Sequence, residues 1–369
     1  MFKKAMPETE KAGRTKNRGK APVDNLCNTS SALKMLYIHA LFILVIIPVA
    51  FTTFKRNKLW QDELLLWEDV ERGSPKKGRG YTALGVAYFD KGDFDKAVTR
   101  HLTALKLNPD LVEARINLGN VYSKQGRLDE ALKEYRIAVE LSPGNAKAYN
   151  NIGNAYYDRG EFGEAINGYL NALRLKPDLP EAYYNLGNIY SKQGRSDEAL
   201  QAYRMALELK PEFAEAHSNL GNFYLSQGKL KEAEDEYLAA LRLKSDSEKA
   251  HYNLGNIYAK QGRLDGALQE YEIALRLDPG YAEAHNNLGS VYFSQGRLDE
   301  AIGEYLTALK LNADFVEAHT NLGNAYKKKG LMDKAKEEFE IALKLRPDFI
   351  PAQKAISSID SKSQTYESK

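Results

Sequence analysis

Asparagine side chains recur along this sequence at a fixed spacing of 34 residues. A primary amide carries hydrogen-bond donors and an acceptor, so it can pair with the backbone C=O and N–H groups of another chain whatever its sequence. An extended peptide rises about 3.3 Å per residue, so one such amide could serve about every third residue of a bound segment. The pattern predicts a peptide-binding surface built from Asn117, Asn151, Asn185, Asn219, Asn253, Asn287 and Asn321.

A second asparagine follows three residues after most of these positions, one turn further along if the segment is helical. The second set consists of Asn120, Asn154, Asn188, Asn222, Asn256 and Asn324. Together the two sets predict a double stripe of amides, which we call the asparagine surface. The alternative is that asparagine at these positions satisfies local backbone groups and takes no part in binding.

The positions just beyond this stripe alternate with a period of 68 residues, twice the asparagine spacing. Every second unit carries a lysine there, and these lysines are Lys124, Lys192, Lys260 and Lys328. The units between them carry a large apolar residue one position earlier, namely Phe89, Tyr157, Leu225 and Phe293. One hypothesis is a binding groove of alternating apolar and lysine rungs, suited to extended acidic–aliphatic segments. The other is that the chain arose by duplication of a two-unit ancestor.

Four histidines also recur at intervals of 34 residues, and a regular set of imidazoles could suggest bound metal. They are His217, His251, His285 and His319. Packed helices lie about 8–10 Å apart, whereas a zinc–nitrogen bond is about 2.1 Å, so one ion could not join two members of the set. We therefore expect these side chains to serve packing.

The sequence contains no other recognisable catalytic or cofactor chemistry. It has no Gly-rich phosphate loop, nucleophile elbow or cluster with metal-ligand spacing, so we expect no catalytic residue, no bound metal and no cofactor. A net charge of +2 is too small to predict a nucleic-acid partner. The single cysteine, Cys27, excludes a disulfide framework within the chain.

Glycine and alanine share the 34-residue period and divide the chain from residue 78 into eight units. The units span 78–111, 112–145, 146–179, 180–213, 214–247, 248–281, 282–315 and 316–349. In each unit, apolar and small residues recur at intervals of three and four, the pattern of two amphipathic helices. One helix pair cannot bury both of its apolar stripes, so the pairs must stack.

The second unit shows a known pattern most fully, in Leu118, Gly119, Tyr122, Gly126, Ala131, Tyr135, Ala138 and Pro143. The pattern resembles that of the tetratricopeptide repeat, a family of helix hairpins. The resemblance implies an all-α fold of eight hairpins in a right-handed superhelical solenoid, whose first helices line the concave face. The asparagine ladder is similar to that in the repeat arm of the protein O-linked N-acetylglucosamine transferases. By this resemblance the asparagine surface lies in the concave groove.

Residues 35–54 form an apolar run without Asp, Glu, Lys or Arg, whose length matches the roughly 20 residues that a helix needs to cross a bilayer. We therefore predict one N-terminal transmembrane helix, with a buried core helix or a cleaved signal peptide as the alternatives. Eight basic residues precede the run and fewer follow it. The positive-inside rule then predicts a single-pass protein of a bacterial inner membrane, with a cytoplasmic N-terminus and extracytoplasmic repeats.

The flanking segments complete the expected organisation. These are a basic disordered tail at 1–34, a juxtamembrane segment at 55–77, a C-terminal capping helix at 350–360 and a disordered tail at 361–369. Within the juxtamembrane segment, residues 59–72 predict the second helix of a degenerate half-repeat that caps the solenoid.

The junction from Arg56 to Arg79 also resembles that of mannosyltransferase-like membrane proteins with tetratricopeptide tails. Two functional hypotheses follow from these observations. The first is a membrane-anchored scaffold that binds protein or peptide ligands and is not an enzyme. The second is an accessory or substrate-presenting subunit of a membrane glycosyltransferase complex.

Overall fold

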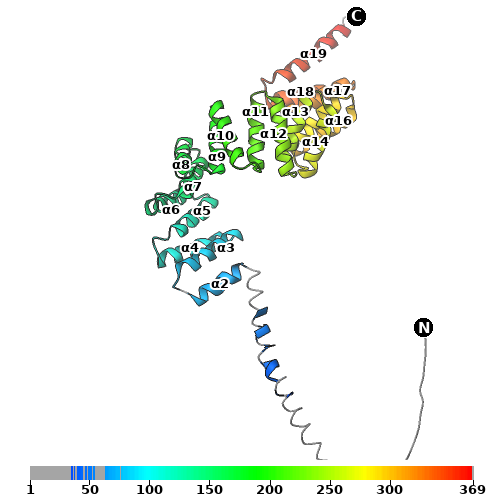
Figure 1. Cartoon of the computed structure of the whole chain (residues 1–369). Coiled ribbons are helices and arrows are strands. Elements are labelled where there is room, and N and C mark those ends of the chain that lie inside the picture. The colour runs from blue at the N-terminus through cyan, green and yellow to red at the C-terminus, as the bar shows by residue number, and fades with distance from the viewer. Residues whose placement is uncertain are drawn as a thin grey trace, which may run out of the picture. The chain divides into compact units, whose positions relative to one another are not determined.

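The computed structural model describes residues 63–74 and 76–367, together with scattered residues between 35 and 54. Every regular element within these residues is a helix, and no strand occurs among them, so the predicted all-α class is confirmed (Figure 1). The chain divides into two compact units, the first ending at Ala114 and the second beginning at Arg115.

The first unit contains α2 (Glu63–Gly73), α3 (Gly78–Asp90) and α4 (Phe94–Leu107). The second unit begins within α5 (Val112–Lys124) and continues with α6 (Leu128–Leu141), α7 (Ala146–Asp158), α8 (Phe162–Leu175), α9 (Pro180–Lys192), α10 (Ser196–Leu209), α11 (Ala214–Ser226), α12 (Leu230–Leu243), α13 (Glu248–Lys260), α14 (Leu264–Leu277), α15 (Ala282–Ser294), α16 (Leu298–Leu311), α17 (Val316–Lys328), α18 (Met332–Leu345) and α19 (Ile350–Glu367).

The hairpin of α7 and α8 shows why this sequence folds into helix pairs. Gly160 ends the first helix with a φ of 76°, a conformation that a side chain disfavours, and Glu161 N–H donates back to the Tyr156 carbonyl at 2.9 Å. Gly153 lets the two helices approach, because a Cβ atom there would lie 2.7 Å from the Tyr169 ring. The tyrosine is thus fully buried against the neighbouring helix.

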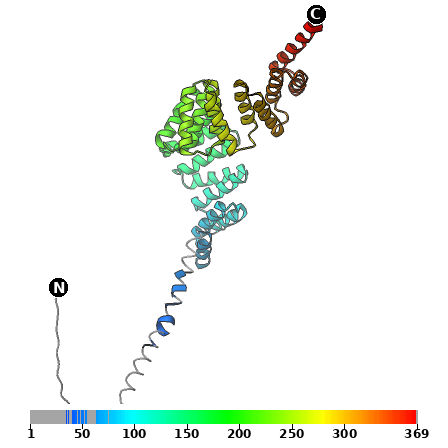
Figure 2. The same cartoon turned by 90° about the vertical axis from the view of Figure 1, so that its right-hand side faces the viewer.

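Successive hairpins of the second unit pack on one another, as the green and yellow helices in Figure 2 show. A continuous cluster of buried residues joins α10 to α15, and its large members include Tyr203, Tyr237 and Tyr271. The exposed fractions of these three tyrosines are at most 2%, so the tyrosines fill the volume that glycine leaves between helices. Stacking therefore buries what one hairpin alone would expose.

Each unit has a further helix that packs on one of its hairpins. In the first unit, α2 packs on α3, where the Tyr88 hydroxyl donates to Glu68 at 3.0 Å. In the second unit, α19 packs on α18, and Ala352 is fully buried in a cluster with Val316 and Ala342. The last helix continues to Glu367, beyond the end at residue 360 expected from the sequence.

The transmembrane helix predicted at residues 35–54 is contradicted. Within the described part of the chain, no helix is both long and apolar enough to cross a bilayer. The predicted single-pass localisation depended on this transmembrane helix and is therefore also wrong. The predicted membrane contact through residues 35–54 loses its support for the same reason. The expected N-terminal tail, residues 1–34, lies outside the described residues.

Candidate peptide-binding surface

The two sets of asparagines are linked to each other across the junctions between hairpins. At the junction of α9 and α11, the Asn188 side-chain oxygen accepts from the Tyr203 hydroxyl at 2.8 Å and from Asn219 Nδ2 at 2.8 Å. Both lone pairs of this oxygen are thereby used. Asn188 therefore joins the second helix of its own hairpin to the first helix of the next.

The same arrangement repeats along the second unit. First-set amides donate from Asn151 to Asn120 (2.8 Å), from Asn185 to Asn154 (3.0 Å), from Asn253 to Asn222 (3.0 Å) and from Asn287 to Asn256 (2.8 Å). The tyrosine hydroxyls donate from Tyr135 to Asn120 (2.8 Å), Tyr169 to Asn154 (2.8 Å), Tyr237 to Asn222 (2.5 Å) and Tyr271 to Asn256 (2.6 Å). Burial raises the pKa of each of these tyrosines, so the hydroxyls stay protonated donors.

The hydrogen-bond network differs in the hairpins where another residue replaces the asparagine or the tyrosine. In the seventh hairpin, Ser290 replaces the acceptor amide and takes the Tyr305 hydroxyl at 3.2 Å. Asn321 therefore donates instead to Asn286, at 2.9 Å. In the eighth hairpin, Phe339 offers no hydroxyl to Asn324. The tyrosine and the asparagine 15 residues before it thus act as one unit in the hairpins that have both.

The first hairpin lacks both partners, with His101 at the tyrosine position and Val86 at the asparagine position. The His101 ring is fully buried, and neither ring nitrogen has a hydrogen-bond partner within the described residues. Burial lowers the pKa of His101 to about 4, so the ring is neutral near pH 7.

This network uses part of the amide capacity that the sequence predicted for binding. Every first-set asparagine is half-buried, including Asn117 at the start of the second unit. Among the described residues, Asn151, Asn185 and Asn253 each donate in the network and keep a side-chain oxygen that accepts nothing. Asn120 and Asn154 accept in the network and keep their two amide protons. At the Asn120–Asn151 and Asn154–Asn185 junctions, one acceptor and one donor group therefore remain for an outside backbone. Elsewhere the oxygens of Asn219 and Asn287 already accept, from Asn222 at 3.4 Å and from Asn286 at 3.1 Å.

Two of the lysines predicted to alternate with apolar rungs contact those rungs. Lys192 Nζ lies 4.8 Å from the centre of the Tyr157 ring and donates to its hydroxyl at 3.0 Å. Lys328 Nζ lies 4.6 Å from the centre of the Phe293 ring. In both pairs the residues are 35 positions apart, so the 68-residue period places complementary partners on neighbouring helices. Lys124 is exposed, and its charge opposes the burial that raises the pKa of Asp158.

Two hollows open along the asparagine surface. The first, of about 210 Å³, is lined by residues of α9, α11, α12 and α13, among them Tyr184, Ser218, Asn222, Lys249 and Asn253. The second, of about 420 Å³, is lined by residues that include Asn256, Lys260, Asn287 and Ser290. Predicted site residues from successive hairpins are thus brought together in one surface.

The first hollow carries an unusual charge. At the position of Lys249, five of the other hairpins of the repeat have a glutamate, namely Glu113, Glu181, Glu215, Glu283 and Glu317. Lys244 lines the same hollow, together with Glu215. Two cations and one carboxylate give this hollow a net positive rim. An alignment of the 34-residue units with one another would have shown the lysine at position 249.

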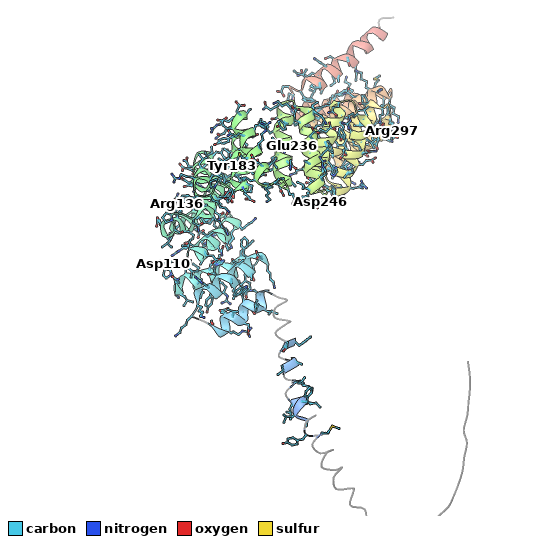
Figure 3. All side chains as sticks on the ribbon, viewed as in Figure 1. Asp110, Arg136, Tyr183, Glu236, Asp246 and Arg297 are labelled. Atoms are coloured by element: carbon cyan, nitrogen blue, oxygen red, sulfur yellow. The ribbon has the colours of Figure 1, made fainter. Side chains whose placement is uncertain are left out.

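The four recurrent histidines have partners that the sequence analysis missed. Nδ1 of His217 lies 2.6 Å from a carboxylate oxygen of Glu236, which Figure 3 labels, and Nε2 lies 3.1 Å from the Pro211 carbonyl oxygen. The other pairs are His251 with Glu270, His285 with Glu304 and His319 with Glu338, each at 2.6 Å. Each histidine precedes its glutamate by 19 residues, a spacing that only the packing of two antiparallel helices brings into contact.

Family models match most of this repeat region. The model of the cilia and flagella-associated protein 70 C-terminal domain matches residues 57–287, more than half of the chain. Two models of the tetratricopeptide repeat match residues 289–330 and 316–349. The chain belongs to the tetratricopeptide-repeat family. Members of this family are typically non-catalytic scaffolds that bind protein or peptide partners, and no curated protein matches this sequence.

Solved structures of tetratricopeptide-repeat proteins resemble the chain. MamA is 30% identical, with 46% of this chain and 92% of that chain covered and a TM-score of 0.43. YrrB, described as a TPR protein with an unusual peptide-binding site, is 28% identical, with 52% and 98% covered and a TM-score of 0.46. The hetero-tetramer Cut9–Hcn1 is 18% identical, with 78% of this chain and 56% of that chain covered and a TM-score of 0.54. At that identity the last match shows a shared fold alone.

Proposed function

We propose that this tetratricopeptide-repeat scaffold holds an extended peptide segment along its asparagine surface. The proposal rests on the asparagine amide groups that the hydrogen-bond network leaves without a partner. At two junctions, Asn120–Asn151 and Asn154–Asn185, the oxygen of the first-set amide and the NH₂ of the second-set amide have no partner within the described chain. A peptide backbone supplies the matching N–H and C=O groups.

The hollows further along the asparagine surface provide the side-chain contacts that such binding requires. The backbone pairing itself is independent of sequence, so specificity must come from pockets for individual side chains. The 210 Å³ hollow offers the hydroxyl of Ser218 and the cations of Lys244 and Lys249. An acidic or polar side chain of the peptide suits this hollow.

The test must leave the asparagine network intact, because the network also joins the hairpins. Ser218→Trp places a large ring in the 210 Å³ hollow without changing any bridging amide. Peptides selected from a random phage-displayed library on the unmodified protein supply the probe. We expect Ser218→Trp to weaken the selected peptides at least about tenfold, about 1.4 kcal/mol, by fluorescence polarisation.

The matched control is Glu232→Trp, which adds the same ring at an exposed position of α12 outside this hollow. This variant should bind the selected peptides as the unmodified protein does. Equal binding by both variants, with unchanged helical circular dichroism, would refute the asparagine surface as the binding site. None of the matches described above names a glycosyltransferase, so the accessory-subunit hypothesis gains no support.

A further inference from the structure

The face of α9 that points away from the asparagine surface lines a third hollow. With 3.6 residues per turn, Tyr183, Leu186 and Tyr190 lie on one face of this helix, opposite Asn185 and Asn188. A hollow of about 550 Å³ lies there between α8, α9 and α10, and we call it the outer pocket. Its lining is Leu170, Leu173, Arg174, Tyr183, Leu186, Tyr190, Glu198, Gln201, Ala202 and Met205.

The outer pocket exists because the fourth hairpin lacks an ion pair that other hairpins have. The positions of Tyr183 and Ala202 correspond, one repeat later, to His217 and Glu236, which are 2.6 Å apart. In the fourth hairpin the small Ala202 leaves that volume empty, and Met205 adds an apolar wall where the fifth hairpin has Ala239.

The third hairpin also lacks this ion pair, but it closes the space in another way. It has Tyr149 and Gly168 at the two positions. A Cβ atom on Gly168 would lie 2.7 Å from the Gly153 backbone nitrogen, so the two helices meet directly. The combination of a small residue and an open volume is therefore particular to the fourth hairpin.

The rim of the outer pocket carries one uncompensated cation. Glu198 pairs with Arg195 at 2.9 Å, and the Arg195 guanidinium lies 4.2 Å from the centre of the Tyr190 ring. Arg174 is exposed and makes no ion pair within the described residues. The pocket thus combines an apolar wall with a free positive charge at its edge.

We propose that the outer pocket binds a protein segment that presents a bulky apolar side chain next to a carboxylate. The volume falls in the range of about 300–1,000 Å³ typical of ligand sites and exceeds what one aromatic ring occupies. The apolar side chain displaces water from Leu170, Tyr183 and Met205, while the carboxylate lies at Arg174. This site is on the opposite face from the asparagine surface, so it operates independently of the proposed function.

The Met205 methyl group makes the proposal directly measurable. N-acetyl-L-tryptophan carries an aromatic ring and a carboxylate, and N-acetyl-L-tryptophanamide carries the ring alone. In ¹³C-methyl-methionine NMR of the full chain, we expect N-acetyl-L-tryptophan to shift the Met205 signal saturably. The signal of Met332, on α18, should not move and serves as the internal control. The amide should bind about threefold more weakly, the scale of one exposed ion pair.

Two variants separate the apolar wall from the rim charge. Ala202→Glu restores the residue type of the fifth to eighth hairpins and should abolish the Met205 shift. Arg174→Gln, a surface change that leaves the fold intact, should remove the preference for the carboxylate over the amide. Arg204→Gln changes an exposed arginine outside the lining and should have no effect. An unmoved Met205 signal, or an unchanged preference in Arg174→Gln, would overturn the proposal.

Discussion

At the scale of single residues, the asparagines hold the fold together as well as offering groups for binding. Asn188 accepts from Tyr203 and from Asn219, and both contacts are half-buried. A half-buried donor that loses its acceptor keeps most of its desolvation cost. Asparagine at these positions therefore has a structural role that is sufficient by itself to explain the regular spacing, and binding must use what that role leaves over.

Asn188→Ala should consequently destabilise the protein. The change strands two donors, so we expect a loss of about 1–3 kcal/mol in the free energy of unfolding, measured by urea denaturation. The matched control is Asn324→Ala, because the equivalent second-helix residue there is Phe339, which donates nothing. Comparable losses in the two variants would show that the bridging hydrogen bonds do not carry the effect.

At the scale of helices, an ion pair joins the two helices of each hairpin from the fifth to the eighth. Both ring nitrogens of His217 face acceptors, the Glu236 carboxylate and the Pro211 carbonyl oxygen, and only the protonated ring can donate to both. The hydrogen bond to Glu236 raises the pKa of His217. At His251 and His319 burial acts to lower the pKa, but the carboxylate and carbonyl contacts outweigh it and the pKa is raised.

These histidines predict a pH dependence confined to the later hairpins. A folded-state pKa above the unfolded value contributes stability that is fully present below about pH 6.5 and is lost as the pH rises through the folded pKa. Between about pH 6 and pH 8, hydrogen exchange corrected for its intrinsic rate should become faster in the hairpins of His217, His251 and His319, which are formed by α11–α14 and by α17 and α18. Glu236→Gln should remove the dependence in α11 and α12 alone.

The second hairpin provides the control for this measurement. Arg115 takes the histidine position there and pairs with Glu134 at 2.7 Å. Arginine keeps its charge throughout this pH range, so protection of the hairpin formed by α5 and α6 should stay constant. A uniform change from α5 to α18 would argue against the histidine pairs as its source.

At the scale of the whole molecule, each hairpin of the second unit depends on its neighbours. The last hairpin has α19 as its outer neighbour, and Phe349 packs against the cluster of Val316, Ala342 and Ala352. In a linear stack, a change at one end is felt mainly by the adjacent repeat.

Deletion of residues 350–369 should therefore expose Val316 and Ala342 and increase hydrogen exchange in α17 and α18. We expect protection in α7–α10 to remain as in the full chain, because those hairpins keep all their neighbours. Mass spectrometry of the exchanged protein reports both regions in one experiment. Loss of protection along the entire stack would mean that the hairpins unfold as one cooperative body.

The sequence by itself determined the helices and their turns, because these depend on contacts between residues close in the chain. The 3.6-residue periodicity placed the apolar stripes, and glycines such as Gly160 marked the turns. At residues 35–54 the apolar composition predicted a membrane span, whereas no helix among the described residues is long and apolar enough to cross a bilayer. Tertiary structure decided which polar groups meet, since Asn219 and Asn188 are 31 residues apart and His217 and Glu236 are 19 apart. It alone also revealed the outer pocket, because an empty volume depends on how three helices pack around Ala202.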